Sequence, residues 1–127
     1  MLKVARYALN ERMLVPLILV AALLASPAKA AERRCGWVQN PTPANWSLID
    51  QDGEWVIGVQ GGYQSPGMDN IPDLSGREWK SVNGSHGYGC ACMTVTTDKS
   101  RRRVINIASV KQLPLRQCRG DSRLPRP

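Results

Sequence analysis

The stretch GYGCACMTV, residues 87–95, places two cysteines one residue apart in a run of small and apolar residues. Side chains alternate between the two faces of an extended strand, so Cys90 and Cys92 lie on one face and Ala91 and Met93 on the other. The pattern predicts a strand over 88–97 whose two thiols point the same way.

The N-terminal residues have the three parts of a cleavable signal peptide. Three basic side chains precede an apolar run at 14–25, and small residues follow at Ala28 and Ala30. A spanning helix needs about 20 apolar residues, more than this run supplies, so we favour cleavage after Ala30 over a retained membrane anchor. We predict a signal peptide at 1–30, a single small domain at 31–127, and a periplasmic or secreted location.

All four cysteines fall in the predicted mature segment: Cys35, Cys90, Cys92 and Cys118. An even number of cysteines in a small exported domain indicates a disulfide framework, and we predict two bridges. A direct Cys90–Cys92 bridge would distort the strand, because residues two apart on a strand are about 7 Å apart. We expect Cys35 to bring the N-terminal segment, and Cys118 the C-terminal tail, to one of these thiols each. The sequence leaves open whether Cys35 pairs with Cys90 or with Cys92.

The charge of the chain excludes some partners. The formal charge of +7 falls to +4 when the net +3 of residues 1–30 is removed. The remaining cations do not alternate with aromatic residues as they do in a nucleic-acid groove. We expect no nucleic-acid partner, and no stable membrane anchor after cleavage of the signal.

A hairpin is predicted upstream of the cysteine-bearing strand. Residues 46–50 and 55–59 alternate with period two on either side of Asp52-Gly53. An Asp-Gly pair is a strong hairpin signal, because glycine accepts a positive φ without penalty. Trp46 and Trp55 are placed on the inward faces of this hairpin.

The rest of the mature chain is assigned more coarsely. Residues 31–45 are predicted to form an extended arm that Trp37 attaches to the body, and the tail after residue 113 is predicted to be irregular. A strand is expected at 103–110, with Ile105 and Ile107 in the core.

A long polar segment at 61–87 separates the hairpin from the cysteine-bearing strand, and we expect a short helical turn near 71–79 within it. The predicted fold is a small all-β, disulfide-stapled barrel or roll. An OB-like barrel, with this long segment between its second and third strands, is one arrangement that fits.

Four stretches carry a resemblance to a known family: RCGWVQNPTPANW (34–46), DGEWVIGVQGGYQSPGMDNIPD (52–73), YGCACMTV (88–95) and PLRQCR (114–119). Together they resemble the bacterial family of exported proteins DUF4087 over essentially the whole mature chain. The resemblance implies a location in the bacterial envelope. It implies no catalytic residue, because the family has no assigned reaction.

The candidate binding residues lie in or beside the polar segment. Tyr63 and Trp79 are flat rings that could bind a sugar, a peptide or a protein, although packing of the segment onto the barrel explains them equally well. His86 is the only histidine and is a third candidate. We predict a non-catalytic binding or interaction module without a cofactor, whose partner is an envelope polymer or a secreted or periplasmic protein.

Two alternatives use the same residues differently. A small hydrolase would combine Ser85 and His86 with Asp69 or Asp73, but adjacent Ser and His side chains point apart on an extended backbone. A metal-handling protein would use the four thiolates with His86. A C-x-C pair is not the spacing that structural zinc sites favour, and exported thiols tend to oxidise first, so we expect no metal site.

Overall fold

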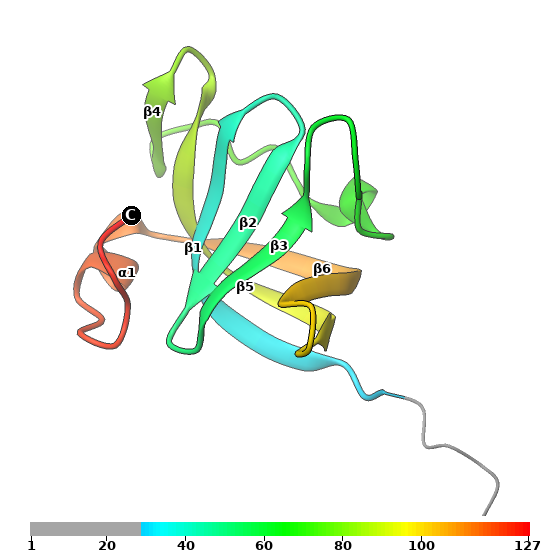
Figure 1. The fold of residues 1–127 in the computed structure, drawn as a ribbon. Helices are drawn as coiled ribbons and strands as arrows, with labels where there is room; N and C mark the ends of the chain where they lie inside the picture. The colour runs from blue at the N-terminus through cyan, green and yellow to red at the C-terminus, as the bar shows by residue number, and fades with distance from the viewer. Residues whose placement is uncertain (1–28) are drawn as a thin grey trace, which may run out of the picture.

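The structure, a computed structural model, describes residues 29–127, and the six strands of this part of the chain form one sheet that curls back on itself (Figure 1). The strands are β1 (Glu32–Thr42), β2 (Asn45–Asp50), β3 (Gly53–Gly58), β4 (Trp79–Asn83), β5 (His86–Asp98) and β6 (Arg103–Leu113). A 3-10 helix, η2 (Met68–Asn70), lies between β3 and β4, and the short helix α1 (Leu115–Arg119) follows β6.

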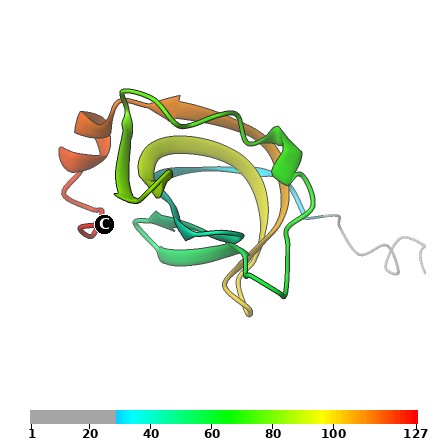
Figure 2. The same ribbon diagram turned by 90° about the horizontal axis from the view of Figure 1, so that it is seen from above.

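Five of these strands form a ring. The order along the sheet is β1-β2-β3-β6-β5-β4, and β1 also pairs with β5, so that β4 is attached to β5 outside the ring. The ring closes where Val56 of β3 and Arg103 of β6 form a parallel bridge, and Figure 2 shows it end-on. The predicted small all-β, disulfide-stapled barrel is confirmed. The OB-like arrangement stays a prediction.

The N-terminal segment is extended, as predicted, but it is a central strand and not a peripheral arm. β1 pairs antiparallel with β5 from Glu32 to Asn40 and with β2 from Trp37 onward. Both faces of β1 are also covered by apolar side chains, so that Val38 and Trp37, on opposite faces, are 0% and 2% exposed. A strand buried on both faces lacks the apolar and polar alternation that identifies a half-buried strand, and the sequence pattern therefore missed it.

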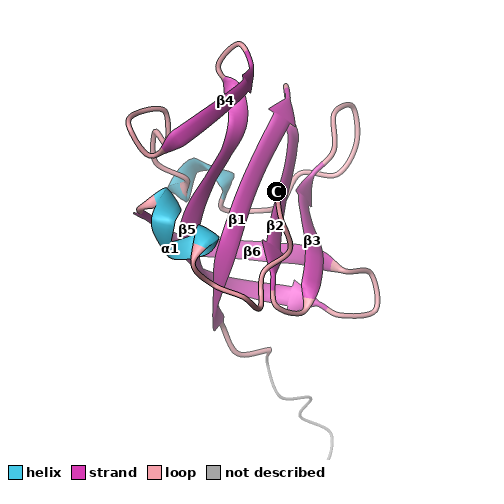
Figure 3. Cartoon of the chain, turned by 90° about the vertical axis from the view of Figure 1, so that its left-hand side faces the viewer, coloured by secondary structure: helices cyan, strands magenta, loops and turns pink. Residues whose placement is uncertain are grey.

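Two apolar clusters lie on the two sides of the ring wall. The inner cluster fills the ring and consists of Val38, Leu48, Trp55, Ile57, Leu74, Ala91, Met93, Val95, Val104 and Ile107. The outer cluster is formed by Trp37, Cys90, Leu115 and Cys118, where α1 and the C-terminal tail cover the outer face of β1 and β5 (Figure 3). The faces of β5 are therefore those that the GYGCACMTV pattern predicts.

The core assignment on β6 is half right. Ile107 is 1% exposed, but Val104 at 0% takes the inward position and Ile105 is only half-buried. The register with β5 shifts between Thr96 and Thr97, where two steps along β6 match one step along β5. Such a bulge exchanges the residues of β6 that point into the ring with those that point out of it. A prediction from strict alternation does not include this exchange.

The long segment and the tail also differ in detail from the expectation. The helical turn lies at Met68–Asn70 and not at 71–79, and Trp79 begins a strand. The tail is not irregular throughout, because α1 follows Pro114 directly. Proline suits the start of a helix, where its missing N–H leaves no helical bond unmade.

The predicted signal peptide falls almost entirely on residues 1–28, which lie outside the described residues. Within residues 29–127, no helix is both long enough and apolar enough to cross a membrane.

Candidate functional site

A groove of about 300 Å³ lies at the end of the ring where the β1–β2 turn, β4 and the segment after β3 come together. The β1–β2 turn and β4 lie in the upper part of Figure 1. Apolar groups, uncharged polar groups and one carboxylate share its lining, which consists of Asn40, Trp46, Met68, Ile71, Pro72, Asp73, Leu74, Ser75, Trp79 and Ser85. Polar groups placed among aromatic and aliphatic walls are typical of small-ligand sites, and this volume is at the low end of their range of about 300–1,000 Å³.

Trp79 forms one wall of the groove and is held from two sides. Its indole Nε1 donates a hydrogen bond to the carbonyl oxygen of Ser85 at 3.1 Å. Its ring lies against Gly89 on β5, where a β-carbon would come within 3.0 Å of the indole Cε3. The half-buried ring also packs against the inner cluster. The position of the indole is therefore set before any ligand arrives.

The turn that carries Met68 is docked on β6. Gly67 has a φ of 87°, and a β-carbon there would lie 2.1 Å from the carbonyl oxygen of Ile107. The Asn70 side-chain amide donates to the same oxygen at 2.8 Å, and the Ile107 N–H donates to the Pro66 carbonyl oxygen at 2.9 Å. This turn is therefore a fixed wall of the groove.

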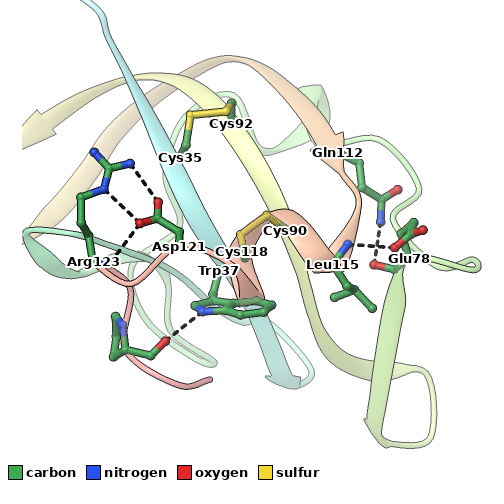
Figure 4. The surroundings of a disulfide bond; sticks show 11 residues. Cys35, Trp37, Glu78, Cys90, Cys92, Gln112, Leu115, Cys118, Asp121 and Arg123 are labelled. Atoms are coloured by element: carbon green, nitrogen blue, oxygen red, sulfur yellow. Dashed lines mark hydrogen bonds and ion pairs between the residues drawn. A yellow bond between two sulfur atoms is a disulfide. The ribbon is translucent and has the colours of Figure 1, made fainter.

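The next part of the segment is tied to β6 and α1, as Figure 4 shows. Gln112 Nε2 donates to the carbonyl oxygens of Leu74 and Glu78 at 2.9 and 3.4 Å. The Leu115 N–H at the start of α1 donates to Glu78 Oε2 at 2.8 Å. The long polar segment is therefore anchored at several points along its length.

His86 lies beside the groove and pairs with one of its lining residues. His86 Nδ1 is 2.9 Å from Asn40 Oδ1, and Asn40 Nδ2 donates to the carbonyl oxygens of Thr42 and Asn45, both at 2.9 Å. These two carbonyls fix the orientation of the amide, so the His86 Nδ1 atom must carry the proton. The hydrolase hypothesis needs an acid at this position, and the structure places an amide there.

Asp73, an acid of that hypothesis, is occupied locally. Its Oδ1 atom accepts hydrogen bonds from the backbone N–H and the hydroxyl of Ser75. The hydrogen bond from the Ser75 side chain, followed by that from its backbone, lowers the pKa of the Asp73 carboxyl. Asp73 is therefore a fixed anion at the rim of the groove, turned toward Ser75.

Tyr63 does not line the groove. Its hydroxyl donates to the carbonyl oxygen of Val104 at 2.7 Å, and the Arg103 guanidinium lies over its ring at 4.1 Å from the centroid. Tyr63 thus attaches the start of the long segment to β6. Of the three candidate binding residues, Trp79 lines the groove, His86 contacts its edge through Asn40, and Tyr63 lies elsewhere.

The cysteines form two adjacent bridges, Cys35–Cys92 and Cys90–Cys118 (Figure 4). The two-bridge prediction is confirmed, and the pairing that the sequence left open is settled. The first bridge joins β1 to β5, and the second joins β5 to α1. The metal-handling hypothesis needs four thiolates, and no cysteine in the described part of the chain is free.

A second cluster, at the opposite end of the ring, was not predicted from the sequence. The Arg34 Nη1 atom donates to Asp50 Oδ2 at 2.8 Å, and both side chains are buried. The guanidinium groups of Arg34 and Arg102 lie 4.0 and 3.9 Å from the Trp55 ring centroid. Burial acts to lower the pKa of Arg34, but hydrogen bonds to Asp50, Asp52 and Glu32 outweigh it and raise that pKa. The groups of this cluster bond mainly to one another, and we assign it a structural role.

Comparison with known proteins agrees with the resemblance seen in the sequence. Residues 29–125 match the family described as a protein of unknown function, DUF4087. The chain belongs to the DUF4087 family. No curated protein and no solved structure matches it significantly. Membership of DUF4087 carries no activity with it, so a function has to be argued from the groove itself.

Proposed function

We propose that this DUF4087 protein is a small exported binding domain without catalytic activity, and that its ligand occupies the groove beside Trp79. The observation that carries the proposal is the pair of half-buried indoles of Trp46 and Trp79 in one groove. They come from different strands, β2 and β4, and the anchored segment forms another wall of the groove. Preformed aromatic walls reduce the ordering cost of binding.

Export is supported by the disulfides. Structural disulfides persist in oxidising compartments and are rare in the reducing cytosol. A domain of this size buries a limited core, and each bridge stabilises it by about 2–4 kcal/mol. We propose the periplasm, or the medium outside the cell, as the place where the protein works, and an envelope polymer or a secreted or periplasmic protein as its partner.

The absence of catalysis in this proposal is supported by the surroundings of His86. The imidazole is oriented by the Asn40 amide, and, within residues 29–127, the Ser85 hydroxyl makes no hydrogen bond to it. Asp73 bonds to Ser75. The nucleophile, base and acid that a hydrolase needs in hydrogen-bonding reach of one another are not assembled.

Site-specific photocrosslinking in living cells tests the proposal. A benzophenone amino acid replaces Ser75, an exposed residue at the rim of the groove, in the full-length chain. The matched control replaces Ser109, an exposed serine on β6 that does not line the groove. We expect a covalent adduct in the envelope or secreted fraction from position 75 and not from position 109.

Two results would overturn the proposed function. Equal adducts at positions 75 and 109 would show that the groove is not the binding site. Recovery of the protein from the cytoplasm with four free thiols, measured by mass spectrometry, would overturn export.

A further inference from the structure

The chemistry of the groove also indicates what kind of ligand it takes, an inference that rests on the proposed function. We propose that the groove binds a neutral, hydroxyl-rich saccharide. The argument uses the two indoles, the charge of the lining, and the unused hydrogen-bonding groups at the rim.

The two indoles offer flat apolar surfaces with different hydrogen-bonding states. The Trp79 Nε1 atom is already bonded to Ser85. The Trp46 Nε1 atom donates to no atom of residues 29–127, and Trp46 is half-buried. Because Trp46 lines the groove, its ring forms part of the apolar wall, and its Nε1 donor stays unused within residues 29–127. A sugar ring, with an apolar C–H face and hydroxyls around its edge, matches both features.

The charge of the lining disfavours anionic ligands. No lysine, arginine or histidine lines the groove, and Asp73 is its one ionisable residue among those described. Hydrogen bonds from Ser75 lower the pKa of Asp73, so its carboxylate is ionised at neutral pH. Phosphate and carboxylate recognition in proteins uses Arg and Lys clusters. A phosphorylated or acidic polymer would meet only a negative charge here.

The rim carries hydrogen-bonding groups that an apolar peptide would leave unpaired. The Oδ2 atom of Asp73 accepts no hydrogen bond from residues 29–127, because Ser75 bonds to Oδ1. The Ser85 hydroxyl is also without a bonded partner in this range, although its carbonyl is used. Covering such groups with apolar side chains costs about 1–3 kcal/mol for each buried group. Sugar hydroxyls can donate to the carboxylate and pair with the serine hydroxyl.

The size of the groove agrees with this ligand class. A volume of about 300 Å³ suits a small part of a polymer, whereas a stable protein partner usually buries about 1,200 Å² or more in total. The rim is exposed at Asp73 and Ser75, so that a saccharide chain could continue beyond the sugar ring that occupies the groove. A glycan of the bacterial envelope would meet these conditions.

Binding of uncharged oligosaccharides to the full-length, disulfide-bonded protein tests the inference. The probes are a tetramer of N-acetylglucosamine and a tetramer of glucose, and binding is followed by tryptophan fluorescence and by calorimetry. We expect saturable binding of at least one tetramer, and at least a ten-fold increase in Kd for Trp79→Ala and for Asp73→Ala.

The chain contains a matched control for the aspartate. Asp98 shares the local turn of Asp73, since its Oδ1 atom accepts from the backbone N–H and hydroxyl of Ser100 at 3.1 and 2.7 Å. It differs in that Arg101 also contacts its carboxylate, through the backbone N–H at 3.2 Å and the side chain at 3.9 Å. Asp98 does not line the groove. Asp98→Ala should therefore leave the Kd within two-fold. Circular dichroism and the mass of the oxidised protein check that each variant is folded.

The outcomes separate the ligand class from the proposed function. If neither tetramer binds while photocrosslinking still labels position 75, the saccharide inference fails and the binding function stands. If neither tetramer binds and the adducts at positions 75 and 109 are equal, the saccharide inference and the proposed binding function are both overturned. Tetramer binding that is unchanged in Trp79→Ala and Asp73→Ala would place the sugar elsewhere and overturn the inference.

Discussion

Cys35 and Cys92 lie directly opposite each other on the antiparallel strands β1 and β5, with their Cα atoms 4.0 Å apart. The second bridge starts two residues away on the same face of β5, at Cys90, and ends at Cys118 in α1. The two bridges differ in exposure, because Cys35 is exposed whereas Cys90 and Cys118 are only 1% and 4% exposed.

This difference predicts the order in which the bridges are reduced. An attacking thiolate has to reach a sulfur atom, and Cys35 is the accessible one. Mild reductant followed by alkylation and peptide mass spectrometry should label Cys35 and Cys92 first, while Cys90 and Cys118 stay bridged. Labelling of Cys118 before Cys35 would show that the outer cluster does not protect its bridge.

The buried ion pair of Arg34 predicts a large loss of stability. Arg34→Ala leaves the Asp50 carboxylate, whose side chain is 4% exposed, without its cation. Breaking one side of a buried pair costs about 3–5 kcal/mol, because the remaining charge is uncompensated. The free energy of unfolding, measured in urea, should fall by this amount.

Arg101→Ala is the matched control for Arg34→Ala. Arg101 pairs with Asp98 at 3.9 Å with a side chain that is 69% exposed, and exposed pairs contribute about 0–1 kcal/mol. Equal losses in the two variants would contradict a structural role for the Arg34 cluster.

Glu32 predicts a dependence of stability on acid. The hydrogen bond from Thr97, together with the hydrogen bond and the charge of Arg34, lowers the pKa of the Glu32 carboxyl below its ordinary 4.5. Between the lowered and the ordinary pKa the unfolded chain binds more protons than the folded one, so stability rises with pH there. The contribution is complete above the ordinary pKa and is lost as the pH falls through the lowered one.

Glu32→Gln should therefore flatten the loss of stability on acidification below about pH 5, measured as Tm against pH. Glu54→Gln is the control, since Glu54 is exposed and makes no side-chain hydrogen bond within residues 29–127. If Tm falls equally steeply with falling pH in Glu32→Gln and in the wild type, other carboxyl groups cause the loss of stability in acid.

Two glycines test how the wall of the groove is held. Gly61 and Gly67 both have a positive φ, 73° and 87°, so alanine is strained at either position. Only Gly67 meets β6, where a β-carbon would lie 2.1 Å from the Ile107 carbonyl oxygen, whereas Gly61 has open space around it.

Gly61→Ala should cost about 1–2 kcal/mol of stability through backbone strain alone. Gly67→Ala should cost more and should also detach the turn that carries Met68, which amide hydrogen exchange at Ile107 and Asn70 would report as faster exchange. Identical costs, with unchanged exchange at Ile107, would mean that the turn tolerates displacement from β6.

Part of the candidate site was predictable from the sequence. Trp79 was identified because an aromatic residue stood in a polar segment, and it lines the groove. Tyr63 satisfied the same criterion but is tied to Val104. Trp46 was placed on the inward face of the hairpin. It packs against the inner cluster, as that placement implies, and it also lines the groove, which the sequence did not indicate. Sequence composition shows which rings lie near polar residues, but it does not show which of them a distant strand covers.

The sequence by itself determined the strand that carries the two thiols, the hairpin around Asp52-Gly53 and the number of disulfides. Each of these follows from a local rule: alternation along a strand, the φ tolerance of glycine, or an even cysteine count. These rules act over a few residues, so they hold whatever the rest of the chain does.

Only the tertiary structure decided which cysteines pair, that β1 is a central strand, and that Trp46 and Trp79 share a groove. All three depend on closing the ring, which brings together residues that are tens of positions apart. The register across β1 and β5 sets Cys35 opposite Cys92, and a one-residue shift would reverse every face. The stretch GYGCACMTV determines which way its two thiols point. The segments that pack against this strand, β1 and α1, determine which cysteine bonds to each thiol.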